Sequence, residues 1–393
     1  MRVLSHKIRI YPNNKAISHF AMCFGAARFA YNWALDFCKK AHEGGRKCPS
    51  GYDLSNALTV VKKSQFRWMY DVSKWVTQMA VLNVGESFQN FFKKRARFPK
   101  FKKKGKCRDS FYINGNQIKV DGKHIRVPKL GFVRMSQGLR FSGKILSGVF
   151  SRRGGKYFVS IQVELDDAYV YPHKCKSQAG VGVDMGIKDL AVLSTGEKFE
   201  GPKALRYYLG KLKRLQRSLS RKKKGSRNRD RARLMLSRCH ECIRDIRIDY
   251  AHKMTAELVE RYRLIGIEDL DVMGMLRKNR FARYVSDSGL RELRRQLGYK
   301  SKLSGSEVVE VDRFYPSTKL CSCCGFKLES LDLSVRRWEC PVCGVSHDRD
   351  INAARNILEE AARGYREAGN ACGEGARHVR MQSFEKQEGG VLC

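Results

Sequence analysis

The sequence has little negative charge. Only 39 of its 393 residues are Asp or Glu, whereas 78 are Lys or Arg, so the formal net charge is +39. The dominant partner of such a chain should be a polyanion, and nucleic acid is the first candidate.

Long apolar runs and an export signal are lacking as well. No stretch of about 18 or more consecutive apolar residues occurs, and the N-terminus does not show the pattern of a signal peptide. We therefore expect a soluble cytoplasmic protein with no membrane partner. The 14 cysteines include four in CxxC pairs. In a chain without an export signal, this arrangement favours reduced thiols and metal binding, which excludes the extracellular classes.

The N-terminal half alternates between strand-like and helical segments. Polar and apolar residues alternate over residues 7–11, which predicts a short strand. Apolar residues recur at helical spacing from about residue 15 to 94, and strand patterns return over about 111–165. We expect the early strand and the later ones to form one small barrel, with the helical region as an insertion.

The second half begins with a shift in composition near residue 179. A basic, mostly helical stretch follows over about 203–262, and a short apolar run at 264–267 predicts a buried strand. From about residue 369 the chain is rich in glycine and polar residues without periodicity, which predicts a mobile tail. The length allows two or three domains.

Two CxxC pairs near the C-terminal end indicate a metal site. Fifteen residues, 325–339, separate the pairs, and glycine follows each pair directly. This spacing is typical of a tetrahedral four-cysteine zinc site, and four thiolates leave no open position for water. We therefore predict one structural Zn²⁺ rather than a catalytic one. Its ligands are Cys321, Cys324, Cys340 and Cys343.

Two acidic residues follow apolar strand patterns. Asp184 ends a run of small apolar residues over 179–183, and Glu268 ends the run over 264–267. Each carboxylate should lie at the end of a buried strand. Taken alone, either is more often a hydrogen-bonded structural residue than a functional one.

A third acidic position opens a predicted helix. Asp348 and Asp350 precede an apolar helical stripe, and the helix dipole favours an ionised carboxylate in the first turn. Three neighbouring acids would repel one another unless divalent cations neutralise them, and oxygen ligands suit Mg²⁺ or Mn²⁺. Two such ions can promote phosphodiester cleavage. The spacing does not show that the acids converge.

The order of these motifs closely resembles that of TnpB proteins, which are transposon-encoded, RNA-guided nucleases related to type V CRISPR effectors. Shorter N-terminal segments are similar too, so the resemblance spans nearly the whole chain. The similar segments are Gly182–Lys188, Ile265–Leu270, the two cysteine pairs, His347–Ile357, Arg9–Pro12, Ala27–Asn32 and Phe98–Lys102.

The resemblance implies an α+β multidomain fold. Its expected parts are a wedge-like β-barrel (residues 1–14 and 105–172) with an inserted helical recognition lobe (15–104), a RuvC-like, RNase H-like α/β nuclease domain (179–318 and 346–366), a four-cysteine zinc finger inserted in it (319–345), and a mobile tail (367–393).

The resemblance also implies site residues and partners. The catalytic, magnesium-binding acids map onto Asp184, Glu268 and Asp350, which selects Asp350 over Asp348. The expected partners are a guide RNA made from the transposon end and a double-stranded target DNA. A prokaryotic, nucleoid-associated protein is therefore expected.

Nucleic-acid contacts are expected at three places. The family's positions for reading the flanking motif suggest Lys74, Gln78 and Asn114, and Trp75 beside them is a candidate for stacking. Two basic clusters suit phosphate contact, although a solvated charged loop is the alternative. These clusters include Lys100, Lys102, Lys103 and Lys104, and Arg221, Lys222 and Lys223.

The expected function is RNA-guided, metal-dependent cleavage of DNA beside a short flanking motif, by a two-metal hydrolysis in which water attacks the phosphodiester. One alternative is an RNA-guided DNA-binding repressor without cleavage, which loss of a carboxylate would mark, and none is missing. The other is a RuvC-like nuclease that acts without RNA. In the family, base pairing supplies most of the sequence choice.

Overall fold

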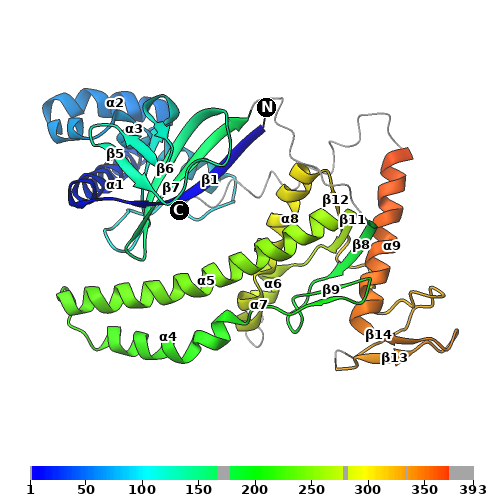
Figure 1. Ribbon diagram of the computed structural model, residues 1–393. Helices are drawn as coiled ribbons and strands as arrows, with labels where there is room; N and C mark the ends of the chain where they lie inside the picture. The colour runs from blue at the N-terminus through cyan, green and yellow to red at the C-terminus, as the bar shows by residue number, and fades with distance from the viewer. Residues whose placement is uncertain (1, 166–177, 278–281, 333, 371–393) are drawn as a thin grey trace. The chain divides into compact units, whose positions relative to one another are not determined.

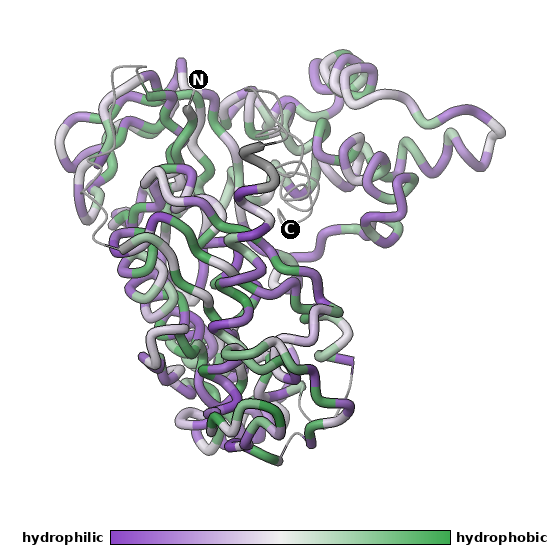
Figure 2. The backbone as a smooth tube through the Cα atoms, turned by 90° about the vertical axis from the view of Figure 1, so that its right-hand side faces the viewer, coloured by the Kyte–Doolittle hydropathy of each residue, from purple (hydrophilic) through white to green (hydrophobic). Residues whose placement is uncertain are grey.

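A computed structural model describes residues 2–165, 178–277, 282–332 and 334–370 (Figure 1). The chain divides into two compact units, one up to residue 165 and one from residue 178. The end of the expected barrel, residues 166–172, and the expected tail from residue 371 onward lie outside the described residues. Hydrophilic and hydrophobic residues are mixed along the helices (Figure 2), and no described helix is long and apolar enough to cross a membrane.

The first unit contains a seven-stranded antiparallel sheet. The strand order is β2-β6-β7-β1-β5-β4-β3, and the N-terminal strand pairs with the last strand from Arg2 opposite Leu165 to Ile10 opposite Tyr157. The early strand therefore joins the later ones, as its alternating pattern predicted. The strands are β1 (Arg2–Tyr11), β2 (Asp109–Asn114), β3 (Lys119–Asp121), β4 (His124–Val127), β5 (Gly131–Met135), β6 (Lys144–Arg153) and β7 (Lys156–Leu165).

Three helices lie between β1 and β2 in the chain: α1 (Asn14–Glu43), α2 (Gly51–Ser64) and α3 (Lys74–Phe92), with short 3-10 turns at Arg67–Asp71 and Gly115–Gln117. The side chain of Asn13 caps α1, and Ser50 caps α2 through a capping box. The fully buried Phe20 of α1 contacts the rings of Phe111 and Phe150 at centroid distances of 5.7 Å. The helical region thus lies between the first strand and the others in the chain, and Phe20 packs it on the sheet.

The second unit is built on a five-stranded sheet in the order β10-β9-β8-β11-β12. Strands β8, β11 and β12 are parallel, and β9 is antiparallel to β8. The elements are β8 (Gln178–Asp184), β9 (Ala191–Leu193), β10 (Lys198–Phe199), α4 (Ala204–Ser220), α5 (Arg227–Arg261), β11 (Tyr262–Glu268), α6 (Val272–Arg277), α7 (Ala282–Ser288), α8 (Leu290–Ser304), β12 (Glu307–Val311), β13 (Arg337–Glu339), β14 (Ser346–Asp348) and α9 (Arg349–Asn370).

Helices cover both faces of this sheet. Val181 and Ile265 point to the face where α5 and α8 pack, and they share one core with Met254 and Leu293. The alternate residues point to the other face, where α9 packs on β8 and β11. The helix α9 extends to Asn370, so residues 367–370 of the expected tail continue the helix.

Candidate functional site

Glycines allow α9 to lie directly on the sheet. A Cβ atom at Gly182 would stand 1.9 Å from the carbonyl oxygen of Ala354, and one at Gly180 would stand 3.1 Å from Leu358. Any larger residue at Gly182 would therefore push the helix away. The strand and the helix run in opposite directions, because Gly180 meets Leu358 and Gly182 meets the residue four positions earlier.

This register brings Asp350 to the end of β8. Two residues along a strand and four along a helix both span about 6 to 7 Å. Asp184 lies two residues after Gly182 on the strand, and Asp350 lies four residues before Ala354 on the helix. Since Gly182 contacts Ala354, this register places Asp184 beside Asp350. Glu268 joins them, since Gly266 pairs with Gly182 in the parallel ladder and Glu268 follows Gly266 by two residues.

The charges of the other two acids act on Asp184. The pKa of Asp184 is raised from 3.8 to about 7, first by burial and then by the negative charges of Glu268 and Asp350. The positive charges of Arg349 and Arg336 partly oppose this rise. The sequence placed these acids at element ends, and the tertiary structure brings them to one edge of the sheet.

Asp348 and Asp350 have different surroundings. Asp348 accepts hydrogen bonds from the backbone N–H groups of Asp350 and Ile351 at 3.1 and 3.3 Å, so it caps α9, and it also pairs with Lys198 at 3.0 Å. Asp350 instead pairs with Arg336 at 3.1 Å and with Arg349 at 3.2 Å. The cap role of Asp348 leaves Asp350 as the acid that faces Asp184.

Sequence reasoning missed a residue that touches Glu268. The hydroxyl of Ser317, only 3% exposed, donates a hydrogen bond to the carboxylate of Glu268. The carbonyl of Ser317 in turn accepts from the buried side chain of Asn356 at 2.7 Å. The asparagines in the segment His347–Ile357 could have indicated such a clamp, but no local pattern around Ser317 points to Glu268, 49 residues away.

The residues of this edge suit a hard divalent cation. Three carboxylates offer oxygen ligands, which Mg²⁺ and Mn²⁺ prefer. The raised pKa of Asp184 reflects its burial and, after that, the negative charges of the other two acids, and a bound cation would favour its ionised form. Asp184, Glu268 and Asp350 are therefore the candidate ligands.

The raised pKa of Asp184 predicts a pH-dependent stability. The pKa of Asp184 is about 7 in the folded chain but near 3.9 in an unfolded one, so stability falls as pH rises from about 4 to 7. We expect Asp184→Asn to stabilise the metal-free protein by on the order of 2 kcal/mol at pH 8, and by less at pH 5.5.

Thermal unfolding in magnesium-free buffer would measure this difference. The buffer should contain no chelator, because a chelator would also remove zinc. The matched control is Asp245→Asn, which removes the same charge from an exposed position on α5. A lower melting temperature for Asp184→Asn than for the wild type at pH 8 would contradict the prediction.

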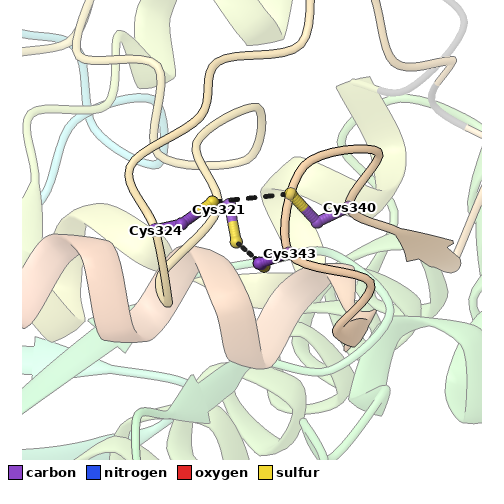
Figure 3. A group of neighbouring side chains, drawn as sticks. All are labelled: Cys321, Cys324, Cys340 and Cys343. Carbon is purple, nitrogen blue, oxygen red and sulfur yellow. Dashed lines mark hydrogen bonds between the residues drawn. The ribbon is translucent and has the colours of Figure 1, made fainter.

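The four cysteines converge as their spacing predicted. The sulfur atoms of Cys321, Cys324, Cys340 and Cys343 all lie within 4.8 Å of one another. Figure 3 shows two loops that deliver one pair each, and the Cys321–Cys343 and Cys324–Cys340 sulfur distances are both 3.6 Å. The sulfur atoms of a tetrahedral zinc–thiolate site are about 3.8 Å apart, given Zn–S bonds of about 2.3 Å. The cluster therefore fits Zn²⁺.

The two loops have the same local geometry. The N–H groups of Gly325 and Gly344 donate to the carbonyls of Cys321 and Cys340, each at 2.9 Å. Both glycines have positive φ values, 75° and 68°, which disfavour other residues. Identical knuckles thus form from short-range sequence alone.

The finger is tied to α9 and to the acids. The buried Asn352 accepts from the N–H of Ser322 at 2.9 Å and donates to the carbonyl of Leu320 at 2.6 Å. From the other side of the finger, Arg336 reaches Asp350. The four-cysteine cluster and the carboxylates therefore belong to one hydrogen-bonded assembly.

The residues suggested for motif reading gather at one end of α3. Lys74, Trp75 and Gln78 lie in its first turns, and Trp75 contacts the ring of Tyr112 on β2, the strand that ends at Asn114. Trp75 is half-buried and its indole N–H is buried without a partner among the described residues, whereas Lys74 is exposed. The structure thus brings the four residues to one neighbourhood without testing their role.

Only part of the first basic cluster is fully exposed to solvent. Lys100, Lys103 and Lys104 are exposed, but the ammonium of Lys102 lies 3.9 Å from the centroid of the Tyr31 ring. Asn32 makes two hydrogen bonds to the backbone of Lys102, at 2.7 and 2.9 Å. Lys102 therefore anchors its loop, and the other three lysines remain candidates for phosphate contact.

The second cluster forms the tip of a helical hairpin. Helices α4 and α5 run side by side (Figure 1), and Arg221, Lys222 and Lys223 are exposed in the turn that joins them. Arg229 donates to the carbonyls of Leu219 and Lys222 at 2.8 Å, which holds the turn. The tip thus presents its cations to solvent on an ordered support.

Three family models match the sequence. A model described as "Probable transposase" matches residues 160–279, one described as "Cas12f1-like, TNB domain" matches 291–357, and one described as "Helix-turn-helix domain" matches 1–47. In the structure, the last segment contains a strand and one helix of 30 residues rather than two short helices.

Two curated relatives match almost end to end. A "Putative RNA-guided DNA endonuclease" of Streptomyces pristinaespiralis is 38% identical over 96% of this chain and 92% of its own length. The "Putative RNA-guided DNA endonuclease InsQ" of Escherichia coli K12 is 34% identical over 98% of both. Among solved structures, CasPhi-2 (Cas12j) bound to crRNA aligns over 91% of this chain and 97% of its own, with 10% identity and a TM-score of 0.46.

Proposed function

Because the chain belongs to the TnpB family, we propose that it is an RNA-guided, divalent-metal-dependent DNA endonuclease of a transposable element. In this proposal it cleaves target DNA beside a short flanking motif, with a RuvC-type site for phosphodiester hydrolysis. The relatives' printed names support the activity. The convergence of Asp184, Glu268 and Asp350 supports the assignment of the site.

The three carboxylates would bind the metal, and neighbouring residues would keep the carboxylates in position. Asp184 and Glu268 are fixed by adjacent parallel strands, and Ser317 orients Glu268 through its hydroxyl. When bound, divalent cations would supply activation of a water molecule and stabilisation of the leaving oxygen. Arg336 and Arg349 neutralise Asp350 in the metal-free chain, and they are placed to bind a phosphate when a cation takes over that role.

The first unit would carry guide and target recognition. We propose that its sheet is the wedge-like barrel (1–14 and 105–172), that its helices are the recognition lobe (15–104), and that Lys74, Trp75, Gln78 and Asn114 lie beside the flanking motif. The second unit would be the nuclease domain (179–318 and 346–366) with its finger (319–345). The exposed lysines of the first unit and the α4–α5 tip offer phosphate contacts for a guide RNA made from the transposon end and for the target strands.

Two alternatives remain distinct from this proposal. A repressor that binds guided targets without cleavage has no need of all three acids, and all three are present and converge. A nuclease that acts without RNA has no need of the exposed lysine cluster in the first unit, outside the nuclease domain. The proposal accounts for both features together.

The test is to redirect the cleavage. The protein is purified with its RNA, the bound RNA is sequenced, and its guide segment is replaced to match a new plasmid target. We expect magnesium-dependent cleavage to move to the new target, and Asp184→Ala to bind it without cleavage. Cleavage that ignores the new guide, or that proceeds equally without RNA, would favour the RNA-independent nuclease.

A further inference from the structure

A tightly hydrogen-bonded loop joins β12 to the first cysteine knuckle. The carboxylate of Asp312 accepts a hydrogen bond from the backbone N–H of Phe314 at 2.8 Å. The backbone carbonyl of Asp312 accepts another from the N–H of Tyr315 at 3.0 Å. The N–H of Ser317 then donates to the carbonyl of Tyr315 at 2.8 Å. These bonds fix the backbone of the loop, so a side chain on it has a defined position.

The loop holds Phe314 in solvent. Its side chain is 87% exposed, more than any other large apolar side chain among the described residues. Its chain neighbours have clear structural contacts, because Arg313 pairs with Asp269 at 2.6 Å and Tyr315 is half-buried against a small core with Ile357. Exposing a whole aromatic ring to water is unfavourable.

The loop that carries the exposed ring also contacts the carboxylate edge. Arg313 contacts Asp269, which directly follows Glu268, and Ser317 donates to Glu268 itself. Two residues lie between Phe314 and Ser317, so their Cα atoms are at most about 11 Å apart. A nucleotide within about three positions of a phosphate held at the acids would therefore be within reach of the ring.

We propose that Phe314 is a base-stacking platform for a single DNA strand at the carboxylate edge. This inference rests on the proposed nuclease function. A base within a duplex has both faces covered by its neighbours, so the ring selects an unpaired base. A protein partner would need a larger apolar surface than one exposed ring offers. Stacking on an aromatic side chain is sequence-tolerant, which suits a guided enzyme.

A fluorescence assay tests the contact without guide RNA or cleavage. Single-stranded oligonucleotides carry 2-aminopurine at successive positions, and they bind the full-length Asp184→Asn protein in magnesium buffer. Stacking quenches this base. We expect quenching by about threefold or more at one or two positions. The quenching should be lost when Phe314→Ala is added to Asp184→Asn and retained when Phe314→Trp is added, since stacking on an aromatic ring is worth roughly tenfold to hundredfold in binding.

Matched variants separate stacking from other effects. Phe314→Leu keeps an apolar side chain without a π-face and should lose the quenching. Tyr365→Ala removes another exposed aromatic residue, 15 positions after Asp350 on α9 and therefore about 22 Å along the helix, and should keep it. Equal quenching by Phe314→Ala and the parent protein would overturn the proposal, as would the absence of quenching at every position. Full quenching by Phe314→Leu would overturn it too.

Cleavage gives the second readout. With Asp184 restored, Phe314→Ala should slow cleavage of a matched target by about tenfold to hundredfold and broaden the distribution of cut positions. Binding of the guided target should stay within about twofold, because base pairing with the guide holds the target. An unchanged rate with unchanged cut positions would overturn the stacking role. Quenching by a chain that cuts no guided target would instead count against the proposed function and leave the platform standing.

Discussion

Asp184→Asn, Glu268→Gln and Asp350→Asn should each reduce cleavage of a guided plasmid target by about a thousandfold or more, which corresponds to roughly 4 kcal/mol in the activation barrier. Each substitution keeps the shape of the side chain but removes one negative oxygen ligand. The three acids come from β8, β11 and α9, so no neighbouring acid can replace a missing one without moving an element. Target binding should stay within about twofold, because none of the three is a cation that contacts phosphate.

Single-turnover cleavage and a gel-shift assay, both with magnesium, measure the two effects separately. The control is again Asp245→Asn, which should cut at the wild-type rate. Mn²⁺ should support cleavage and the omission of divalent ions should abolish it. A variant that retains more than about a tenth of the wild-type rate would remove that residue from the set of metal ligands.

Loss of the zinc ligands should have the second largest effect. We expect the Cys321→Ser, Cys340→Ser double variant to bind no zinc and to lose about a hundredfold or more in cleavage. Zinc supplies the folding energy of such loops, with apparent values of about 10 to 16 kcal/mol. Without it, the segment that carries Ser322 and Arg336 would no longer be held against Asn352 and Asp350.

Metal analysis and the cleavage assay together check this expectation. The wild type should contain about one zinc per chain, and Cys323→Ser is the matched control, because Cys323 lies between the ligands in sequence but is exposed and outside the cluster. Zinc retained by the double variant would refute the four-cysteine site. Zinc lost with cleavage unchanged would show that the finger does not support the carboxylates.

Features that depend on short-range order could be predicted from the sequence. The spacing of Cys321, Cys324, Cys340 and Cys343 identified the finger, because each knuckle closes within five residues through its own hydrogen bonds. The runs before Asp184 and Glu268 predicted strand ends, since a buried parallel strand needs continuous apolar residues.

Packing decided what these residues do together. In the sequence, Gly182 and Gly266 are only small residues within predicted strands. Their contact with α9 in the structure explains why Asp350 lies close to Asp184. The choice of Asp350 over Asp348, which the family resemblance implied, gained its physical reason from the cap that Asp348 forms on α9.

The fate of individual polar side chains was decided in the same way. Lys102 looked like one more phosphate ligand, yet its contact with Tyr31, 71 positions earlier, makes it an anchor. Ser317 and Arg336 carry no local signal at all, because their partners are Glu268 and Asp350 in other elements. The sequence by itself thus determined the elements, the zinc ligands and the strand-end acids, through periodicity and short loops. Only the tertiary structure decided which acids meet and what supports them, because those contacts depend on how distant segments pack.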